Sequence, residues 1–228
     1  MTSNLPKPSE KRETVQTMFD RISGRYDLVN RIMTFRMDVR WRKRVVAEMD
    51  MTPGGSVLDL ACGTGDFAQL LNSKGYKSIG IDLSAGMLES ASSDFVRVQG
   101  DLLELPVATS SVDGCVCGFA LRNLVELPSF FSECARVIRP GGRLGILEVS
   151  EPTNPILNKG HDLYLNKLVP KIGSMLSDKS AYAYLPESVE YLPPTPELEA
   201  LMSAAGFSEV RSIQLNSGIA QLLVGTRA

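Results

Sequence analysis

Histidine is nearly absent from this chain, and cysteine is scarce. His161 is the only histidine, and the four cysteines are Cys62, Cys115, Cys117 and Cys134. The spacing of Cys115 and Cys117 is not that of a zinc-binding pair, and no histidines cluster near them. We therefore predict no metal site and expect the cysteines to be buried free thiols, as in a reducing compartment.

Long apolar runs and an excess of charge of one sign are also missing. No stretch approaches the ~20 apolar residues that a membrane-spanning helix needs, and the polar N-terminus does not resemble a signal peptide. The formal net charge of −2 argues against nucleic acid as a partner. Hydrophobic residues make up 43% of the 228 residues, enough for one core. We expect a cytoplasmic globular protein with one generous domain.

A glycine-rich turn is the most informative local pattern. Residues 57–61 are apolar or small around Asp59, Gly63 and Gly65 follow, and a helix is expected from about Asp66. Glycines leave backbone N–H groups accessible at the positive end of a helix dipole, where a polar or anionic ligand binds well. The turn alone indicates a nucleotide-like ligand.

Two cofactors fit this turn. The sequence Gly63-x-Gly65-x-x-Ala68 matches the dinucleotide fingerprint loosely, with Asp82 as a ribose ligand. An acidic residue on the first strand, here Asp59, followed by Gly-x-Gly resembles more closely the methyltransferases that use S-adenosylmethionine (SAM).

Strands and helices alternate after this turn, with short connections. Strands are expected at residues 56–61, 77–81, 95–99, 112–119, 143–149, 208–215 and 219–226, and helices from about residues 66, 84, 127 and 195. Such alternation predicts an α/β fold with a doubly wound, mostly parallel seven-stranded sheet. The turn at residues 216–218 predicts an antiparallel final hairpin, which resembles the end of a SAM methyltransferase and differs from a plain dinucleotide domain.

Two segments are expected to flank the cofactor site. Residues 1–50 carry three apolar helical faces and are predicted to form an N-terminal cap or lid, whereas residues 51–228 form the SAM-binding domain with a helical insertion at about 151–190. Methionine-rich, aromatic faces suit a flexible apolar substrate. Packing on the sheet explains them equally well.

Several longer stretches resemble the ubiquinone/menaquinone C-methyltransferase family. They are residues 26–30 (Tyr-Asp-Leu-Val-Asn) leading to Trp41, residues 119–123 (Phe-Ala-Leu-Arg-Asn), residues 136–144 running into Glu148, residues 182–188 and residues 216–220. The resemblance covers about residues 15–227 and implies SAM as the methyl donor and a prenylated quinol as the substrate. Among the departures, Ala120 and Pro186 stand where the family commonly has glycine and alanine, which leaves the exact quinone undecided.

The resemblance also implies the cofactor residues. Asp59 and the glycine loop would hold the methionine end of SAM, and Asp82 the ribose hydroxyls. Met87 would pack on adenine, and Asp101 would accept from its amino group beside the N–H of Leu102. The predicted set is Asp59, Ala61, Gly63, Thr64, Gly65, Asp82, Leu83, Met87, Asp101, Leu102 and Phe119. Solvation of strand ends is the plainer role for Asp82 and Asp101, and core packing for Met87.

Four residues are candidates for the chemistry. Arg122 would stabilise a quinol oxyanion because a guanidinium is always charged, and Asn123 would orient the ring oxygens. His161 titrates in the range required of a proton acceptor. Tyr26 is a candidate for the pocket wall or for a hydrogen bond. Three of these also have a plainer role: a salt bridge for Arg122, a surface position for His161 and core packing for Tyr26.

Other functions are compatible with the sequence. They include a SAM methyltransferase for another aromatic or polyketide substrate, a non-catalytic SAM- or nucleotide-binding subunit, and an NAD-dependent oxidoreductase. Contact between the basic residues 40–44 and an anionic membrane surface is a further hypothesis, although a solvated helix edge explains them as well. Assembly into a homodimer is another.

Overall fold

The computed structural model describes residues 8–91, 94–150, 152, 184 and 188–228. Most of the insertion predicted at about 151–190, including His161, lies outside the described residues.

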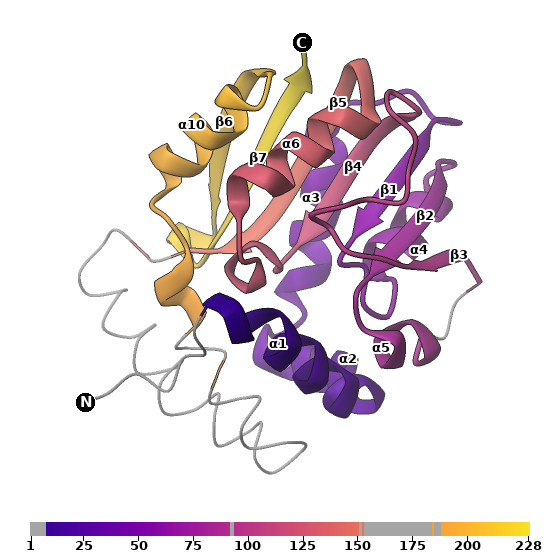
Figure 1. The fold of residues 1–228 in the computed structure, drawn as a ribbon, viewed down its shortest axis with the longest axis vertical. Coiled ribbons are helices and arrows are strands. Elements are labelled where there is room, and N and C mark those ends of the chain that lie inside the picture. The colour runs from indigo at the N-terminus through magenta and orange to yellow at the C-terminus, as the bar shows by residue number, and fades with distance from the viewer. Residues whose placement is uncertain (1–7, 92–93, 151, 153–183, 185–187) are drawn as a thin grey trace.

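A seven-stranded sheet in the order β3-β2-β1-β4-β5-β7-β6 forms the centre of the fold (Figure 1). Strands β1 to β5 pair in parallel, whereas β7 is antiparallel to both β5 and β6. The strands are β1 Ser56–Leu60, β2 Lys77–Asp82, β3 Val96–Gln99, β4 Val112–Gly118, β5 Ile138–Val149, β6 Phe207–Leu215 and β7 Ala220–Arg227. The predicted α/β architecture and the antiparallel final hairpin are confirmed.

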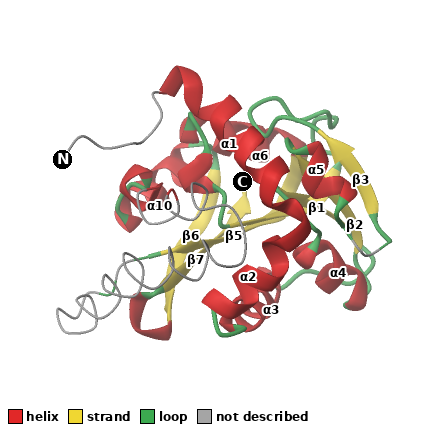
Figure 2. Ribbon diagram, turned by 90° about the horizontal axis from the view of Figure 1, so that it is seen from below, coloured by secondary structure: helices red, strands yellow, loops and turns green. Residues whose placement is uncertain are grey.

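Helices cover both faces of the sheet and one of its edges. The α-helices that position the site are α1 Pro8–Ile22, α2 Tyr26–Met33, α3 Met37–Met49, α4 Asp66–Ser73, α5 Ala85–Glu89, α6 Leu127–Val137 and α10 Thr195–Ala204. Helices α6 and α10 pack on one face, and α3 and α4 on the other. Helices α1, α2 and α5 lie at the edge where the parallel strands end (Figures 1 and 2). No helix within the described ranges is both long and apolar enough to cross a membrane.

Two apolar layers hold the sheet between its helices. On the α6 side the largest buried side chains include Phe130 and Phe131, and on the α3 side Met49 and Leu71. All four cysteines are free and buried, as predicted. Burial raises the pKa of these thiols because a thiolate loses solvation in an apolar interior.

The close packing of α3 depends on a glycine. A Cβ at Gly145 on β5 would lie 2.8 Å from both Met49 Sδ and Val45 Cγ1 of α3. A larger residue would therefore push α3 away from the sheet. This contact fixes the helix that delivers Arg42 to the site.

The fold differs from the predicted element ends by more than one residue at two places. Strand β5 begins at Ile138 and not at residue 143, because the Pro140-Gly141-Gly142 segment is included in the strand as an irregularity in its pairing with β4. Helix α5 ends at Glu89, whereas the sequence predicts a helix through Ala91.

Candidate functional site

A cleft lies between the carboxyl ends of the parallel strands and helices α1 and α2. This is the place where open α/β sheets bind ligands. The space between its walls, counted together with the open solvent at its entrance, is about 1060 Å³.

Most of the predicted site residues meet in this cleft. Its wall includes Tyr26, Asp59, Ala61, Gly63, Thr64, Asp82, Leu83, Met87, Asp101, Leu102, Phe119 and Asn123. Of the predicted site residues that the structure describes, Gly65 and Arg122 do not line the cleft.

The backbone at the floor of the cleft adopts uncommon conformations. Ala61 after β1 and Phe119 after β4 both have positive φ, at 53° and 60°. A residue with a side chain rarely adopts this region, and an aromatic one there is strained. Such strain collects at ligand sites. The two strand ends that are expected to meet the cofactor are thus both held in shape by the surrounding packing.

The two glycines of the loop have different physical requirements. Gly65 has φ +93°, and a Cβ there would lie 2.2 Å from the ring of Phe95. Gly63 has φ +54°, and its Cβ would meet the end of Met87 at 3.3 Å. Packing therefore accounts for glycine at residue 65, whereas Gly63 is the one whose backbone forms the cleft wall.

Asp82 organises the loop and still has acceptor capacity. Its carboxylate accepts the N–H of Gly63 at 2.7 Å and that of Ser84 at 2.9 Å. Burial raises its pKa, and these N–H donors oppose the shift. Each carboxylate oxygen has a second lone pair, so Asp82 can also accept hydrogen bonds from a ligand.

Asp59 caps the following helix from the neighbouring strand. Its carboxylate accepts the N–H of Ala68 at 2.8 Å, one of the N–H groups that the first turn of α4 cannot pair within the helix. Burial raises the pKa of Asp59 to about 8, despite the N–H of Ala68 and the nearby charge of Arg42. Asp59 therefore supports the loop whether or not it contacts a ligand.

Asp101 lies beneath the first helix. It accepts the N–H of Leu103 at 2.9 Å and pairs with Arg12 of α1 at 2.9 Å. Leu102 and Met87 are buried and line the cleft. Met87 therefore belongs both to the core and to the ligand wall.

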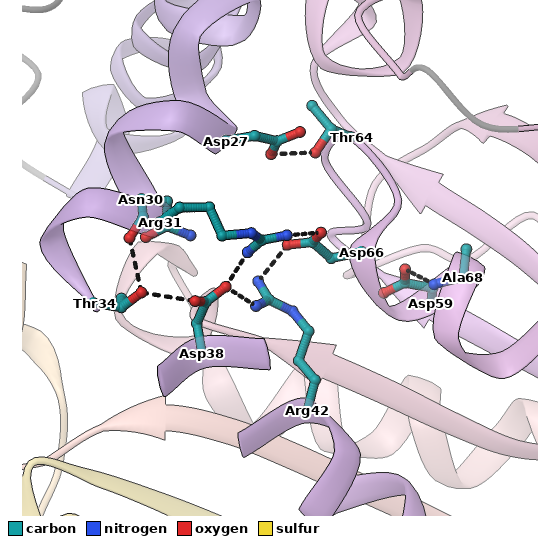
Figure 3. Close-up of polar contacts among 10 residues, drawn as sticks. All are labelled: Asp27, Asn30, Arg31, Thr34, Asp38, Arg42, Asp59, Thr64, Asp66 and Ala68. Atoms are coloured by element: carbon teal, nitrogen blue, oxygen red, sulfur yellow. Dashed lines mark hydrogen bonds and ion pairs between the residues drawn. The ribbon is translucent and has the colours of Figure 1, made fainter. Parts of the chain in front are cut away.

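The N-terminal helices are bound to the glycine loop by a direct hydrogen bond. The hydroxyl of Thr64 donates to Asp27 of α2 at 2.6 Å (Figure 3). On α1, Val15, Gln16 and Phe19 line the cleft. The sequence predicts residues 1–50 as a cap, and α1 and α2 of that segment contribute to the cleft wall beside the glycine loop.

A cluster of four charged residues fixes this arrangement. Arg42 of α3 binds Asp38 at 2.6 Å and Asp66, the first residue of α4, at 3.1 Å, and Arg31 of α2 pairs with the same two carboxylates (Figure 3). Asp38 is completely buried and also accepts the Thr34 hydroxyl at 2.7 Å. Two cations and two anions thus balance each other between the cap and the loop.

Arg42 is buried and lines the cleft, so the hypothesis of membrane contact for the basic residues 40–44 is wrong for Arg42. Its guanidinium lies 5.6 Å from the ring centre of Phe67 and 5.5 Å from that of Phe119. The local signal was the Asp38–Arg42 pair at i and i+4. Asp66 and Arg31 come from separate elements and carry no such signal.

Tyr26 and Asn123 line the cleft, and Tyr184 lies next to Asn123. Tyr184 donates to the amide oxygen of Asn123 at 3.3 Å. Burial raises the pKa of both Tyr26 and Tyr184 to about 12. Both phenols are therefore neutral near pH 7 and can donate a hydrogen bond, but they are poor proton acceptors.

Arg122 lies behind the wall, on the 3-10 turn that follows β4. Its guanidinium pairs with the fully buried Glu148 of β5. The backbone N–H of Arg122 donates to the same carboxylate at 3.4 Å. The Nε–H group is buried and has no hydrogen-bond partner within the described ranges. Such an orphan donor is uncommon and indicates a missing acceptor.

The residues present fit SAM. Acidic side chains end β2 and follow β3, apolar groups separate them, and a glycine loop opens the first turn of α4. Carboxylates suit the ribose hydroxyls and an ammonium group, and a helix N-terminus suits a carboxylate. No group of three or more His, Cys, Asp or Glu side chains in the described part is arranged to hold a metal ion.

Solved structures share this fold. The chain superposes on a SAM-dependent methyltransferase of Thermotoga maritima, described as a possible histamine N-methyltransferase, with a TM-score of 0.67 and 21% identity, covering 93% of this chain and 99% of that one. It also matches Haemonchus contortus phosphoethanolamine N-methyltransferase 2 in complex with SAM, with a TM-score of 0.61, 16% identity, and coverage of 82% and 52%. At this level of identity the likeness concerns the fold.

Sequence relatives are closer. The chain is 37% identical to the ubiquinone/menaquinone biosynthesis C-methyltransferase UbiE of Syntrophotalea carbinolica, over 95% of both chains. It is 37% identical to the demethylmenaquinone methyltransferase of a Roseiflexus species, over 99% of this chain and 98% of the relative. The model of the ubiE/COQ5 methyltransferase family matches residues 7–227. The protein is accordingly a SAM-dependent methyltransferase, and the chain belongs to the ubiE/COQ5 methyltransferase family.

Proposed function

We propose that the protein transfers the methyl group of SAM to a ring carbon of a prenylated quinol, with demethylmenaquinol as the expected substrate. The names of relatives that match almost the entire chain support this reaction. The observation that carries it is the mixed wall of the cleft, which joins acidic residues at the strand ends to apolar residues from other elements. These apolar residues include Val15, Phe19, Leu124 and Val125.

The chemistry determines what the chain must provide. When bound, SAM supplies an electrophilic methyl group on a sulfonium. A quinol carbon ortho to a hydroxyl becomes nucleophilic as that hydroxyl loses its proton, and the ring carbon later loses its hydrogen as a proton to restore aromaticity. The protein must therefore align the ring with the methyl group and favour a phenolate.

Arg122 and Asn123 are proposed to act on the ring oxygens. The charge of Arg122 is partly neutralised by Glu148, but its buried Nε–H is a hydrogen-bond donor without an acceptor among the described residues. Asn123 reaches the cleft itself, and its oxygen is held by Tyr184. This leaves the amide NH₂ of Asn123 to donate to a quinol oxygen. Tyr26, a neutral phenol in the wall, is proposed as a second donor.

The proposed cofactor contacts follow the cleft wall. Asp82 would bind the ribose, Thr64 and the loop the methionine end, and Asp101 with Leu102 the adenine. Arg42 lies over the ring of Phe119 and pairs with Asp66, so it would hold the cleft wall in place beside the methionine end.

Tyr26 and Tyr184 are poor candidates for the proton acceptor, because burial raises their pKa values to about 12. His161 titrates in the range required of a base, although a surface position is the plainer role for it, and both its role as the base and a homodimer stay predictions. A His161→Ala variant with an unshifted pH–rate profile would exclude it as the base.

Substrate identity is tested by offering isotopically labelled SAM and a panel of reduced quinones to the purified protein. Mass spectrometry should find one added methyl group on the demethylnaphthoquinol and less on a benzoquinol. Methylation of small phenols or polyketides with the quinols untouched would favour the alternative of another aromatic substrate. Thermal stabilisation by NAD but not by S-adenosylhomocysteine would contradict the cofactor assignment.

A further inference from the structure

Helix α2 and the turn after it expose apolar side chains beside the packed face of the helix. Val29 and Met33 pack with Ile22 of α1. Leu28 and Ile32, one turn apart on α2, and Phe35 in the turn that follows it are 58%, 40% and 71% exposed. These three are a majority of the five large exposed apolar residues within the described ranges. A helix with apolar residues on both sides normally has a covering surface on each.

Phe35 is exposed by the shape of the turn that follows α2. Phe35 and Arg36 both have positive φ, at 50° and 60°. This conformation is costly for an aromatic residue, and strain of this kind persists at functional positions. Core packing does not explain a side chain that is largely in solvent, so its presentation requires another reason.

The chain segment that contains these apolar residues is strongly basic. Between residues 21 and 44 the chain has eight basic and two acidic residues, in a protein of net charge −2. Both acids are engaged within the fold, since Asp38 is buried in the ion-pair cluster and Asp27 accepts from Thr64. The exposed basic residues are Arg21, Arg25, Arg36, Arg40, Lys43 and Arg44, and Arg44 pairs with Glu48.

We infer that Leu28, Ile32 and Phe35 form a docking surface that inserts into an anionic lipid bilayer, with the basic residues of positions 21–44 against its headgroups. Apolar side chains at the interface together with several cations are the combination that holds a peripheral protein on such a membrane. A protein partner of the same charge complementarity would require an acidic surface around an apolar groove, whereas a bilayer offers both layers everywhere.

The docking surface would also explain how an apolar substrate reaches the cleft. Tyr26, Asp27 and Leu28 are consecutive on α2. Tyr26 lines the cleft, Asp27 accepts a hydrogen bond from Thr64 of the glycine loop, and Leu28 belongs to the docking surface. Neighbouring residues of one helix thus belong to the cleft wall and to the docking surface. This step depends on the proposed prenylated quinol, but the surface itself does not.

The test uses the full chain and vesicles of equimolar phosphatidylcholine and phosphatidylglycerol, in a co-sedimentation assay. The double variant Leu28→Gln with Phe35→Asn removes two apolar anchors, and asparagine tolerates positive φ well. Val96→Gln is the matched control, because Val96 is 59% exposed but lies on β3. Circular dichroism and thermal melting establish that all variants are folded.

We expect the wild type and the Val96→Gln variant to bind these vesicles equally and to release them at high salt. The double variant should need about tenfold more lipid for half-binding. Wild-type protein that stays in the supernatant, or a double variant that binds as well as the wild type, overturns the inference. A wild-type dimer that the double variant converts to monomers in analytical ultracentrifugation would assign the surface to a second copy.

Activity on a short-chain, water-soluble demethylnaphthoquinol without vesicles separates the two proposals. The double variant should turn this substrate over as fast as the wild type. If no form of the protein methylates it while vesicle binding follows the expected pattern, the proposed substrate is wrong and the docking surface stands.

Discussion

The hydroxyl of Thr64, in the cofactor loop, donates a 2.6 Å hydrogen bond to a carboxylate oxygen of Asp27 on helix α2. The two residues lie 37 positions apart in the chain. Together with the cluster of Arg31, Asp38, Arg42 and Asp66, this bond joins helices α2 and α3 to the glycine loop that is proposed to bind the cofactor (Figure 3). Cap docking and cofactor binding should therefore be coupled.

Loss of the Asp27 carboxylate should weaken cofactor binding although Asp27 itself is not predicted to touch SAM. Asp27→Ala leaves Thr64 without its acceptor, and we expect a loss of roughly 0.5–1.5 kcal/mol in S-adenosylhomocysteine affinity by calorimetry. Asp27→Asn retains an acceptor oxygen and should bind more tightly than Asp27→Ala. If wild type and Asp27→Ala bind S-adenosylhomocysteine with equal affinity, the docking of the N-terminal helices is not coupled to cofactor binding.

Arg42 should matter more for stability than its neighbours on α3. Arg42→Met leaves the buried Asp38 and the half-buried Asp66 with one cation, Arg31. Removing one partner of a fully buried pair costs roughly 3–5 kcal/mol, and the remaining pairing with Arg31 should reduce this cost. The free energy of unfolding in urea measures this loss. Arg40→Met, at an exposed position of the same helix, should change it by less than about 0.5 kcal/mol. Similar values for both variants would mean that the cluster contributes little.

Asp82 should be required for cofactor affinity. Asp82→Ala removes the acceptor of the Gly63 and Ser84 N–H groups as well as the expected ribose ligand, and should cost roughly 1–3 kcal/mol in SAM binding. Asp94→Ala, at an exposed position, is the control. Calorimetry that finds unchanged affinity for Asp82→Ala would reject the ribose assignment.

Arg122 should affect turnover and not cofactor affinity. Arg122→Lys retains a cation for the buried Glu148 but loses the Nε–H and the planar donor geometry. We expect kcat to fall about tenfold or more, with S-adenosylhomocysteine affinity within about twofold. If the affinity falls instead, Arg122 supports the cofactor site and does not act on the substrate.

Asp59 should make stability depend on pH in an unusual direction. Its pKa is raised from 3.8 to about 8 in the folded protein, so the folded state holds a proton that the unfolded state releases above about pH 4. This contribution is complete below about pH 4 and is lost as the pH rises through 8. In Asp59→Asn, whose amide oxygen can still accept from Ala68, the fall in melting temperature between pH 5 and 8 should be smaller. An unchanged slope would show that Asp59 is ionised in the native protein.

Much of the sheet was predictable because its signals are local. The pattern around Asp59, Gly63 and Gly65 gave the first strand, turn and helix, and the Asn216–Gly218 turn gave the final hairpin. Acids at or just after strand ends, Asp82 and Asp101, were predicted for the cofactor site and do line the cleft. Parallel strands end at one edge, which explains this agreement.

The contacts between the cap and the loop were not predictable in the same way. Arg31, Asp38 and Asp66 belong to three helices, and their meeting depends on the distance between α3 and the sheet, which Gly145 permits. The pairing of Arg122 with Glu148 depends likewise on the register of β4 and β5. The salt bridge had been the plainer hypothesis for Arg122. It is present, alongside the unused donor on which the catalytic proposal is based.

The most direct test of the central claim is the position of the transferred methyl group. Product made from demethylnaphthoquinol and SAM labelled with ¹³C in its methyl group should give a ¹³C NMR signal typical of a methyl on an aromatic carbon, with long-range couplings to the ring carbons beside it. A signal typical of a methyl ether would place the methyl on oxygen, and would contradict ring-carbon methylation in this cleft.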